Sequence, residues 1–147
     1  MDDRLQTHRP TGGPCAQGTL WPIQVSLPLV NPDAHIIKVA DRTAIGQIYT
    51  GFLPYVVTQG VVAHLMKALA AELGPRGIFM NAIAPGPILK PEDISSEAWK
   101  ALRATSSIEY PITDEEAVEQ FVEAVVRLSS VRSSGGVYPV DLGHFYS

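Results

Sequence analysis

Cysteine is nearly missing from this chain: Cys15 is the single one among 147 residues, so no internal disulfide can form. One thiol fits a reducing compartment, and we expect a cytoplasmic protein. The N-terminus, Met1 to Arg4, is acidic and is followed by no hydrophobic core segment, so no secretory signal peptide is predicted. The apolar runs also fall short of the ~20 residues that a membrane helix needs, and no membrane partner is expected.

Positive charge is scarce as well. Lys and Arg number 11 against 15 Asp and Glu, which gives a net charge of -4. No basic cluster and no interleaving of basic with aromatic residues occurs, so a nucleic-acid partner is not expected. The histidines show no metal-ligand spacing, so no metal site is predicted. They are His8, His35, His64 and His144.

What the sequence does contain is enough apolar material for one folded domain. Hydrophobic residues make up 46% of the chain and charged residues 18%. Glycine and proline crowd residues 1–19, so we expect an irregular leader there, and residues 20–147 are predicted to be the folded part. Residues 11–18 are superficially similar to a phosphate-binding loop, but no buried strand precedes them and Pro22 would interrupt a following helix.

The pattern after residue 20 alternates between helices and short apolar strands. Strands are predicted at about 36–40, 78–84 and 136–141, which favours an α/β fold with a short parallel sheet. A long helix starts near Tyr55 and ends at Gly74-Pro75, with an apolar face. A shorter helix is expected from Ser96 to about Arg103. A capping box, Thr113 with Glu116, opens the last helix, which is expected to bury Val118, Phe121, Val122 and Val125.

Several motifs occur together in a recognisable order: Tyr55, its helix, Gly-Pro-Arg-Gly, a strand, and Asn-Ala-Ile-Ala-Pro-Gly at 81–86. In that order they resemble the second half of a short-chain dehydrogenase/reductase. The resemblance implies a partial Rossmann-like, doubly wound domain and an NAD or NADP cofactor. The family's nucleotide-binding first half has no counterpart in these 147 residues, so a truncated member is expected.

The resemblance assigns roles to particular residues. Tyr55 takes the position of the catalytic tyrosine. Asp41, or Arg42 if the loop is one residue different in length, stands at the strand end where the family has its serine. An aspartate at that strand end is the pattern of pteridine reductases. Gln59 stands where the family has lysine. Gln59, Pro85, Gly86 and Ile88 are expected to contact the cofactor. A threonine that the family often has near Lys90 is missing.

The change to Gln59 matters because a tyrosine phenol has a pKa near 10. A unit charge ~5 Å away, at an effective dielectric of about 20, lowers that pKa by roughly 2 units, and a neutral amide cannot. Arg42 is the one nearby cation that we expect to be able to substitute for lysine. Asp41, if ionised, would raise the phenol's pKa instead.

Three functions remain open. The first is an NAD(P)-dependent oxidoreductase acting on a carbonyl, alcohol or pterin-like small molecule. The second is a non-catalytic remnant that serves as a binding or assembly module. The third and weakest is a hydrolase using histidine with Asp41 or Asp141, for which no nucleophile motif exists.

The strand at 36–40 would be interior in the family's sheet and is an exposed edge here. Exposed apolar edges recruit partners. We therefore expect a homo-oligomer, a partner chain over this edge, or coverage of the edge by residues 20–30.

Overall fold

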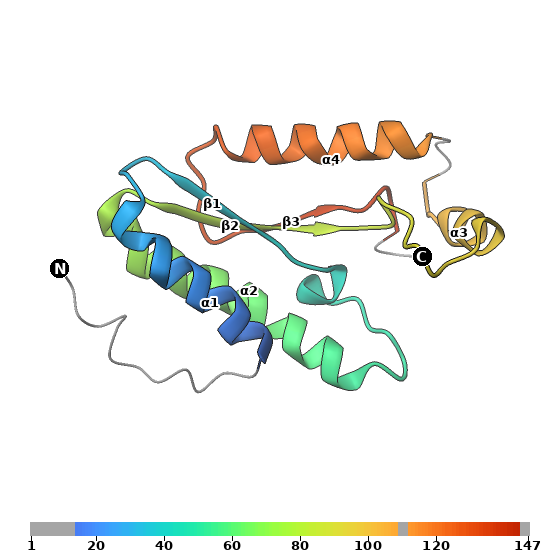
Figure 1. The fold of residues 1–147 in the computed structure, drawn as a ribbon, viewed down its shortest axis with the longest axis horizontal. Coiled ribbons are helices and arrows are strands. Elements are labelled where there is room, and N and C mark those ends of the chain that lie inside the picture. The colour runs from blue at the N-terminus through green and yellow to red at the C-terminus, as the bar shows by residue number, and fades with distance from the viewer. Residues whose placement is uncertain (1–13, 109–111, 145–147) are drawn as a thin grey trace.

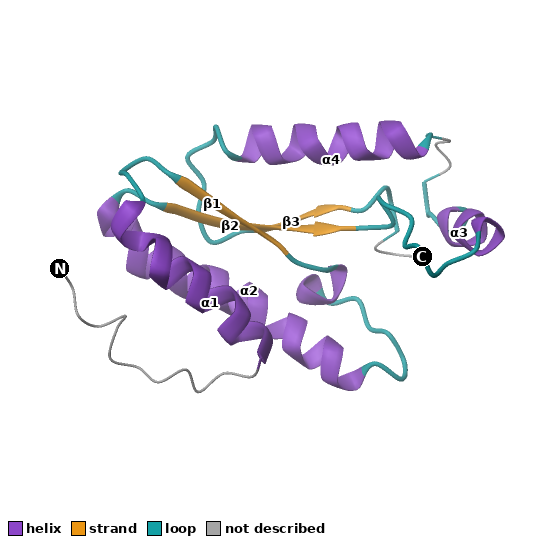
Figure 2. Ribbon diagram, viewed as in Figure 1, coloured by secondary structure: helices purple, strands orange, loops and turns teal. Residues whose placement is uncertain are grey.

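The computed structural model describes residues 14–108 and 112–144 as an α/β domain built on a three-stranded parallel sheet with strand order β1-β2-β3. Helices α1 and α2 cover one face, α4 covers the other, and α3 lies beyond the carboxyl ends of the strands (Figures 1 and 2). The fold class predicted from the sequence is confirmed. The elements are α1 Pro14–Ser26, η2 Leu27–Leu29, β1 His35–Val39, η3 Arg42–Ile45, α2 Leu53–Leu73, η4 Gly74–Arg76, β2 Phe79–Pro85, α3 Ser96–Arg103, α4 Asp114–Leu128 and β3 Val137–Val140.

The middle strand, β2, organises the core because successive side chains point to opposite faces. Met80 and Ala82 join the core cluster beneath α1 and α2, and both are fully buried. Ile83 is also fully buried and lines the opposite face with Tyr138, its register partner on β3. With both faces covered, β2 is apolar nearly throughout, as parallel strands usually are.

Helix α2 supplies most of the core on its side of the sheet. Four of its apolar residues are buried at helical spacing: Val62, Met66, Leu69 and Leu73. The helix gives way to a 3₁₀ turn at Gly74, and Gly77 closes that turn at a φ of 72°. Pro75 cannot continue an α-helix, so the predicted stop at Gly74-Pro75 is where the helix ends.

The apolar character of α2 extends around its circumference. The segment Leu53–Arg76 is long and apolar enough to cross a membrane by length and composition, with 22% of its best window buried. The sequence reading that no such segment exists was therefore wrong. Because α2 packs against β2, η3 and α1, its role in the fold accounts for its buried residues, and its outer residues remain available for another surface.

The predicted leader extends too far. Helix α1 begins at Pro14, so residues 14–19 are helical and not irregular, and Pro22 lies inside the helix. Ile23 and Leu27 anchor this region in the core with α2, and such packing offsets the helix hydrogen bond that Pro22 removes. Residues 1–13 lie outside the described residues, and the described part of the loop-like stretch 11–18, residues 14–18, belongs to α1.

Helices α3 and α4 each begin directly after a capping residue. Thr113 and Glu116 form the predicted capping box, with bonds of 2.7 and 3.2 Å between side chains and backbone. Helix α3 is capped by Ser95, one residue before the predicted cap. Of the four residues expected to be buried on α4, Val118, Phe121 and Val125 are partly buried, whereas Val122 is 53% exposed and the expectation for it was wrong. The fully buried residues of this helix are Ala117 and Leu128.

Asn81 fixes the approach to β3. Its amide donates to the Ser133 carbonyl at 2.7 Å, and its side-chain oxygen accepts from the Gly136 backbone N–H at 3.0 Å. Asn81 is 1% exposed, so these bonds satisfy a buried amide and hold the turn before β3 against the central strand.

Strand β1 forms one edge of the sheet, as predicted. It pairs with β2 alone, and Val39 at its end is 50% exposed. Helix α1 packs on α2 and not along this edge (Figure 1), so residues 20–30 do not cover it. Within the described residues the edge is open.

Candidate functional site

The short helix η3 brings the sequence-predicted residues together. It starts directly after β1 and packs against α2, β2 and β3. Arg42, Thr43 and Ala44 are all buried. In parallel α/β sheets ligands bind outside the carboxyl ends of the strands, and η3 lies at that end.

Asp41 caps η3. Its Oδ1 accepts a hydrogen bond of 2.8 Å from the Thr43 backbone N–H, and its backbone is extended as an N-cap requires. One carboxylate oxygen is therefore committed to structure. Asp41 thus combines a capping role with a carboxylate at the candidate site.

Arg42 does not lie free beside the helix that carries Tyr55. Its Nη2 donates to the Tyr49 hydroxyl at 2.9 Å, and its Nη1 donates to the His144 carbonyl at 2.8 Å. The guanidinium is also 5.9 Å from the centre of the Tyr49 ring. The substitute cation expected from the sequence thus pairs with a different tyrosine.

Burial raises the pKa of Tyr49 above its ordinary value. The Arg42 guanidinium works in the opposite direction by its charge and hydrogen bond, whereas the nearby Asp41 carboxylate raises the pKa further. Because burial prevails, Tyr49 stays a neutral phenol at physiological pH. Its hydroxyl is also 3.3 Å from the Gln47 side-chain oxygen.

Tyr55 and Gln59 lie one helical turn apart at the start of α2. Tyr55 is 40% exposed, so its ring is accessible from solvent. The Gln59 side-chain oxygen is buried and has no hydrogen-bond partner within the described part of the chain. An unsatisfied buried acceptor costs about 1–3 kcal/mol, and a ligand hydroxyl would relieve that cost.

The predicted cofactor residues after β2 serve first to pack the strand ends. Gly86 donates its N–H to the Val140 carbonyl at 3.0 Å, and its Cα lies directly against the backbone of Asp141. Pro85 ends β2, and Ile88 is 6% exposed. Asp141 Oδ2 is buried without a hydrogen-bond partner among the described residues.

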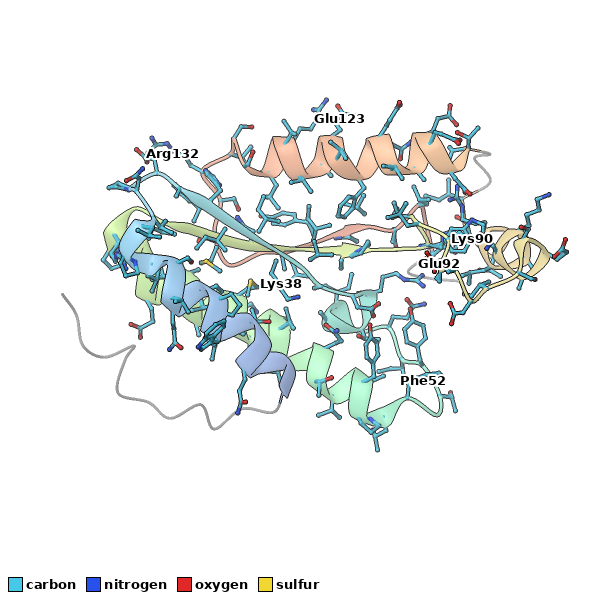
Figure 3. The ribbon with its side chains drawn as sticks, viewed as in Figure 1. Lys38, Phe52, Lys90, Glu92, Glu123 and Arg132 are labelled. Atoms are coloured by element: carbon cyan, nitrogen blue, oxygen red, sulfur yellow. The ribbon has the colours of Figure 1, made fainter. Side chains whose placement is uncertain are left out.

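A covering segment follows from Pro87 through α3. Arg103 holds it in place with bonds of 3.1 Å to the carbonyls of Pro87 and Ile112. Figure 3 shows Lys90 and Glu92 on this segment, beyond the carboxyl ends of the strands, with Phe52 in the loop before α2. Phe52 and Leu89 are 61% and 72% exposed. The segment thus borders the same end of the sheet as Asp41.

Sequence reasoning missed the centre of this arrangement. Tyr49 is not among the residues that the motifs single out, and His144 is considered there only as a metal ligand or a hydrolytic base. The partners of His144, which are Arg42 and the backbone of Leu102 and Arg103, are distant from it in sequence. Only the polar character of 141–144 at the end of a predicted strand could have drawn attention to them.

A nicotinamide cofactor fits this site only in part. Gln59, with its unsatisfied buried oxygen, suits a ribose hydroxyl. Residues 14–108 and 112–144 contain no glycine-rich loop between a strand and a helix that could bind a pyrophosphate. No group of His, Cys, Asp or Glu suitable for a metal occurs in those ranges either.

Comparison with known proteins identifies relatives of one kind. The family model described as enoyl-(acyl carrier protein) reductase matches residues 15–144. L-xylulose reductase from Bos taurus is 33% identical over 94 residues, which are 60% of this chain and 38% of that protein. Carbonyl reductase (NADPH) 2 from Sus scrofa is 31% identical over 102 residues, 67% of this chain and 42% of that protein. The chain thus spans less than half of these curated relatives.

Solved structures share the fold. A short-chain dehydrogenase family protein from Francisella tularensis has a TM-score of 0.69 at 21% identity and covers 90% of this chain and 60% of that one. A short-chain dehydrogenase from Burkholderia cenocepacia in complex with NADP has a TM-score of 0.67 at 21% identity, with 88% and 53% covered. At these identities the likeness concerns the fold.

Gly86 gives a direct test of the packing at this site. A Cβ there would lie 2.6 Å from Asp141 Cα and 2.8 Å from its carbonyl carbon, so Gly86→Ala must force β2 and β3 apart. We expect it to lower the free energy of unfolding by about 2 kcal/mol or more. Gly60→Ala is the control, because nothing lies within 4 Å of that Cβ and alanine favours a helix. Equal stability of both variants in urea denaturation would show that the close approach is wrong.

Proposed function

Since the chain belongs to the short-chain dehydrogenase/reductase family, we propose that it acts as an NAD(P)-dependent oxidoreductase on a carbonyl, alcohol or pterin-like small molecule. The observation that carries the proposal is the placement of Tyr55. It lies on the first turn of α2, a helix that packs against the η3 segment after β1, and in the family resemblance this is the position of the catalytic tyrosine. The curated relatives include two reductases of small carbonyl compounds by name.

Each candidate site residue has a separate role in the proposed reaction. Bound NAD(P)H would supply the hydride. The Tyr55 hydroxyl gives a proton to the substrate oxygen and is recharged from solvent, to which the residue is exposed. Asp41 orients the substrate through the carboxylate oxygen that does not cap η3. Gln59 accepts a hydrogen bond from a cofactor hydroxyl, and Pro85, Gly86 and Ile88 shape the adjoining surface.

The neutral Gln59 limits the rate of this chemistry. It offers hydrogen bonds but no charge, so it does not lower the pKa of a nearby phenol as lysine would. Arg42, the one buried arginine among the residues that the structure describes, donates a hydrogen bond to Tyr49. We therefore expect a reductase that turns over slowly although its site residues are correctly positioned.

A non-catalytic binding or assembly module is the second candidate. Gln59 and the lack of a pyrophosphate-binding loop in the described ranges both favour it. The hydrolase reading gains nothing from the structure, because both ring nitrogens of the buried His144 lie against backbone carbonyls. A cytoplasmic location stays a prediction.

Two surfaces support a homo-oligomer or a partner chain. The β1 edge leaves backbone groups unpaired within the described residues, and Val39 beside it is half exposed. The outer side of α1 and α2 carries exposed apolar residues, with Trp21 68% and Val57 57% exposed. A partner on the edge would extend the sheet on the side where a nucleotide-binding half is needed.

Substitutions at the motif test the chemistry. With NADPH and a panel of small ketones, aldehydes and a dihydropterin, Tyr55→Phe should lower the turnover rate about 100-fold. Gln59→Lys should raise it by about tenfold to 100-fold at neutral pH, because the added charge stabilises the phenolate. Tyr138→Phe is the matched control, since that hydroxyl bonds Ser133 and the residue lines the α4 side of the sheet. A Tyr55→Phe variant at full rate would refute Tyr55 as the acid.

Sedimentation of the purified chain tests the partner proposal. We expect a dimer or larger species, and we expect Val39→Lys to shift it toward monomer by placing a charge on the open edge. Leu89→Lys, at a residue 72% exposed on the covering segment, is the control and should leave the assembly intact. A stable monomer with the natural sequence would contradict an assembly through this edge.

A further inference from the structure

Arg103, in the last turn of α3, joins three parts of the chain that are separated in sequence. Its Nη1 donates to the Pro87 carbonyl at 3.1 Å and to Asp114 Oδ1 at 3.2 Å, and its Nη2 donates to the Ile112 carbonyl at 3.1 Å. The side chain is 14% exposed, so water competes little for these bonds. Arg103 thus connects the chain just after β2, the end of α3 and the start of α4.

Trp99 supports the same connection from one turn earlier on α3. Its indole N–H lies 3.2 and 3.3 Å from the two carboxylate oxygens of Asp114, and its ring centre is 5.9 Å from the Arg103 guanidinium. Trp99 is 5% exposed. Asp114 stands in the first turn of α4, where the helix dipole favours a negative charge. One aspartate therefore accepts hydrogen bonds from both an arginine and a tryptophan of α3.

The bond from Arg103 to Pro87 closes the covering segment into a loop. Pro87 directly follows the predicted cofactor residues at the end of β2, and Arg103 lies at the far end of the segment. Between them, Lys90 Nζ and the Ile94 N–H both donate to the Pro91 carbonyl. These bonds are local to the loop, so the position of its middle part depends on how its two ends are held.

The shape of the guanidinium suits this closure. Arginine has five N–H donors in a rigid planar fork and reaches two carbonyls and a carboxylate in one geometry. A lysine ammonium carries the same charge as a compact point on a flexible stem, so it cannot hold all three acceptors in this arrangement. The closure therefore depends on the fork as well as on the charge.

We propose that Arg103 is a positioning residue whose guanidinium closes the covering segment, residues 87–103, and holds it over the carboxyl ends of the strands. Trp99 and Asp114 fix the guanidinium against the start of α4. The catalytic part of this inference rests on the proposed function, since the segment borders the candidate site. A loosened segment binds substrate less tightly, whereas Tyr55 on α2 keeps its place.

Indole fluorescence and hydrogen exchange of the full chain test the closure without a cofactor. Trp21 is 68% exposed, and Trp21→Phe leaves Trp99 as the single indole of the chain. In this background Arg103→Gln should shift the Trp99 emission to longer wavelength, because the ring gains contact with water. Protection of the Ile88 amide, next to the closure, should fall about tenfold. The Ala82 amide in β2 is the reference and should keep its protection.

Two further variants make the test specific. Arg103→Lys keeps the charge without the fork and should also lower the protection of Ile88. Arg127→Gln is the matched control, because it removes an exposed arginine that bonds Glu123 within α4, and it should change neither readout.

Natural emission and protection in Arg103→Gln would overturn the proposal. An equal fall in protection at Ile88 and Ala82 would also overturn it, since that result means a general loss of stability. Should Arg103→Gln fail to fold, Arg103→Lys carries the same two readouts, and natural values in that variant would overturn the role of the fork.

Kinetics test the catalytic part. In a chain that turns over, Arg103→Lys should raise KM for the carbonyl substrate about tenfold and leave kcat within about twofold, because the segment contributes to binding and not to proton transfer. A lower kcat at unchanged KM would contradict this positioning role. Failure of the natural chain to reduce any carbonyl compound would contradict the proposed function, and fluorescence and exchange would still decide the closure.

Discussion

Burial of β2 between two layers of helix is the constraint on which the rest of the structure depends. Met80, Ala82, Ile83 and Ala84 are fully buried, with α2 on one side and α4 on the other. A parallel strand needs both faces covered. Once β2 is fixed, its parallel neighbours end at the same side of the sheet, and this places η3, the Pro85-Gly86 turn and the turn at 141–144 together. The candidate site follows from that alignment.

The candidate site has the expected tyrosine at the start of α2 but not the expected positive charge beside it. Tyr55 keeps its place at the start of α2, but the position one turn later holds Gln59, which is neutral. The buried positive charge instead belongs to Arg42, which bonds Tyr49 and the His144 carbonyl. A charge that is already paired and buried serves the architecture first, because separating it from its partners would cost several kcal/mol. In the proposed function, this division is the reason that slow catalysis is expected.

The sequence predicted the strands, the long helix and the capping box at Thr113 because these depend on local signals: apolar periodicity, glycine with proline, and a threonine three residues before a glutamate. It failed for α1, where packing of Ile23 and Leu27 outweighs an internal proline, and for Val122, which lies at the exposed margin of the apolar face of α4. It also gave no indication of the hydrogen bonds that Arg42 donates to the Tyr49 hydroxyl and to the His144 carbonyl. The second of these joins residues as far apart as 42 and 144, which no local pattern encodes.

Direct titration of the purified chain with NADPH and NADH, followed by nicotinamide fluorescence, tests the central claim most directly. A site that retains Tyr55 and an unsatisfied Gln59 oxygen for a cofactor hydroxyl predicts saturable binding of at least one dinucleotide, weakened in a Gln59→Leu variant of similar size. Absence of binding at millimolar concentrations of both cofactors would contradict the oxidoreductase function for this chain. The fold would then reflect only common ancestry with the family, and a binding or assembly role would be the better-supported function.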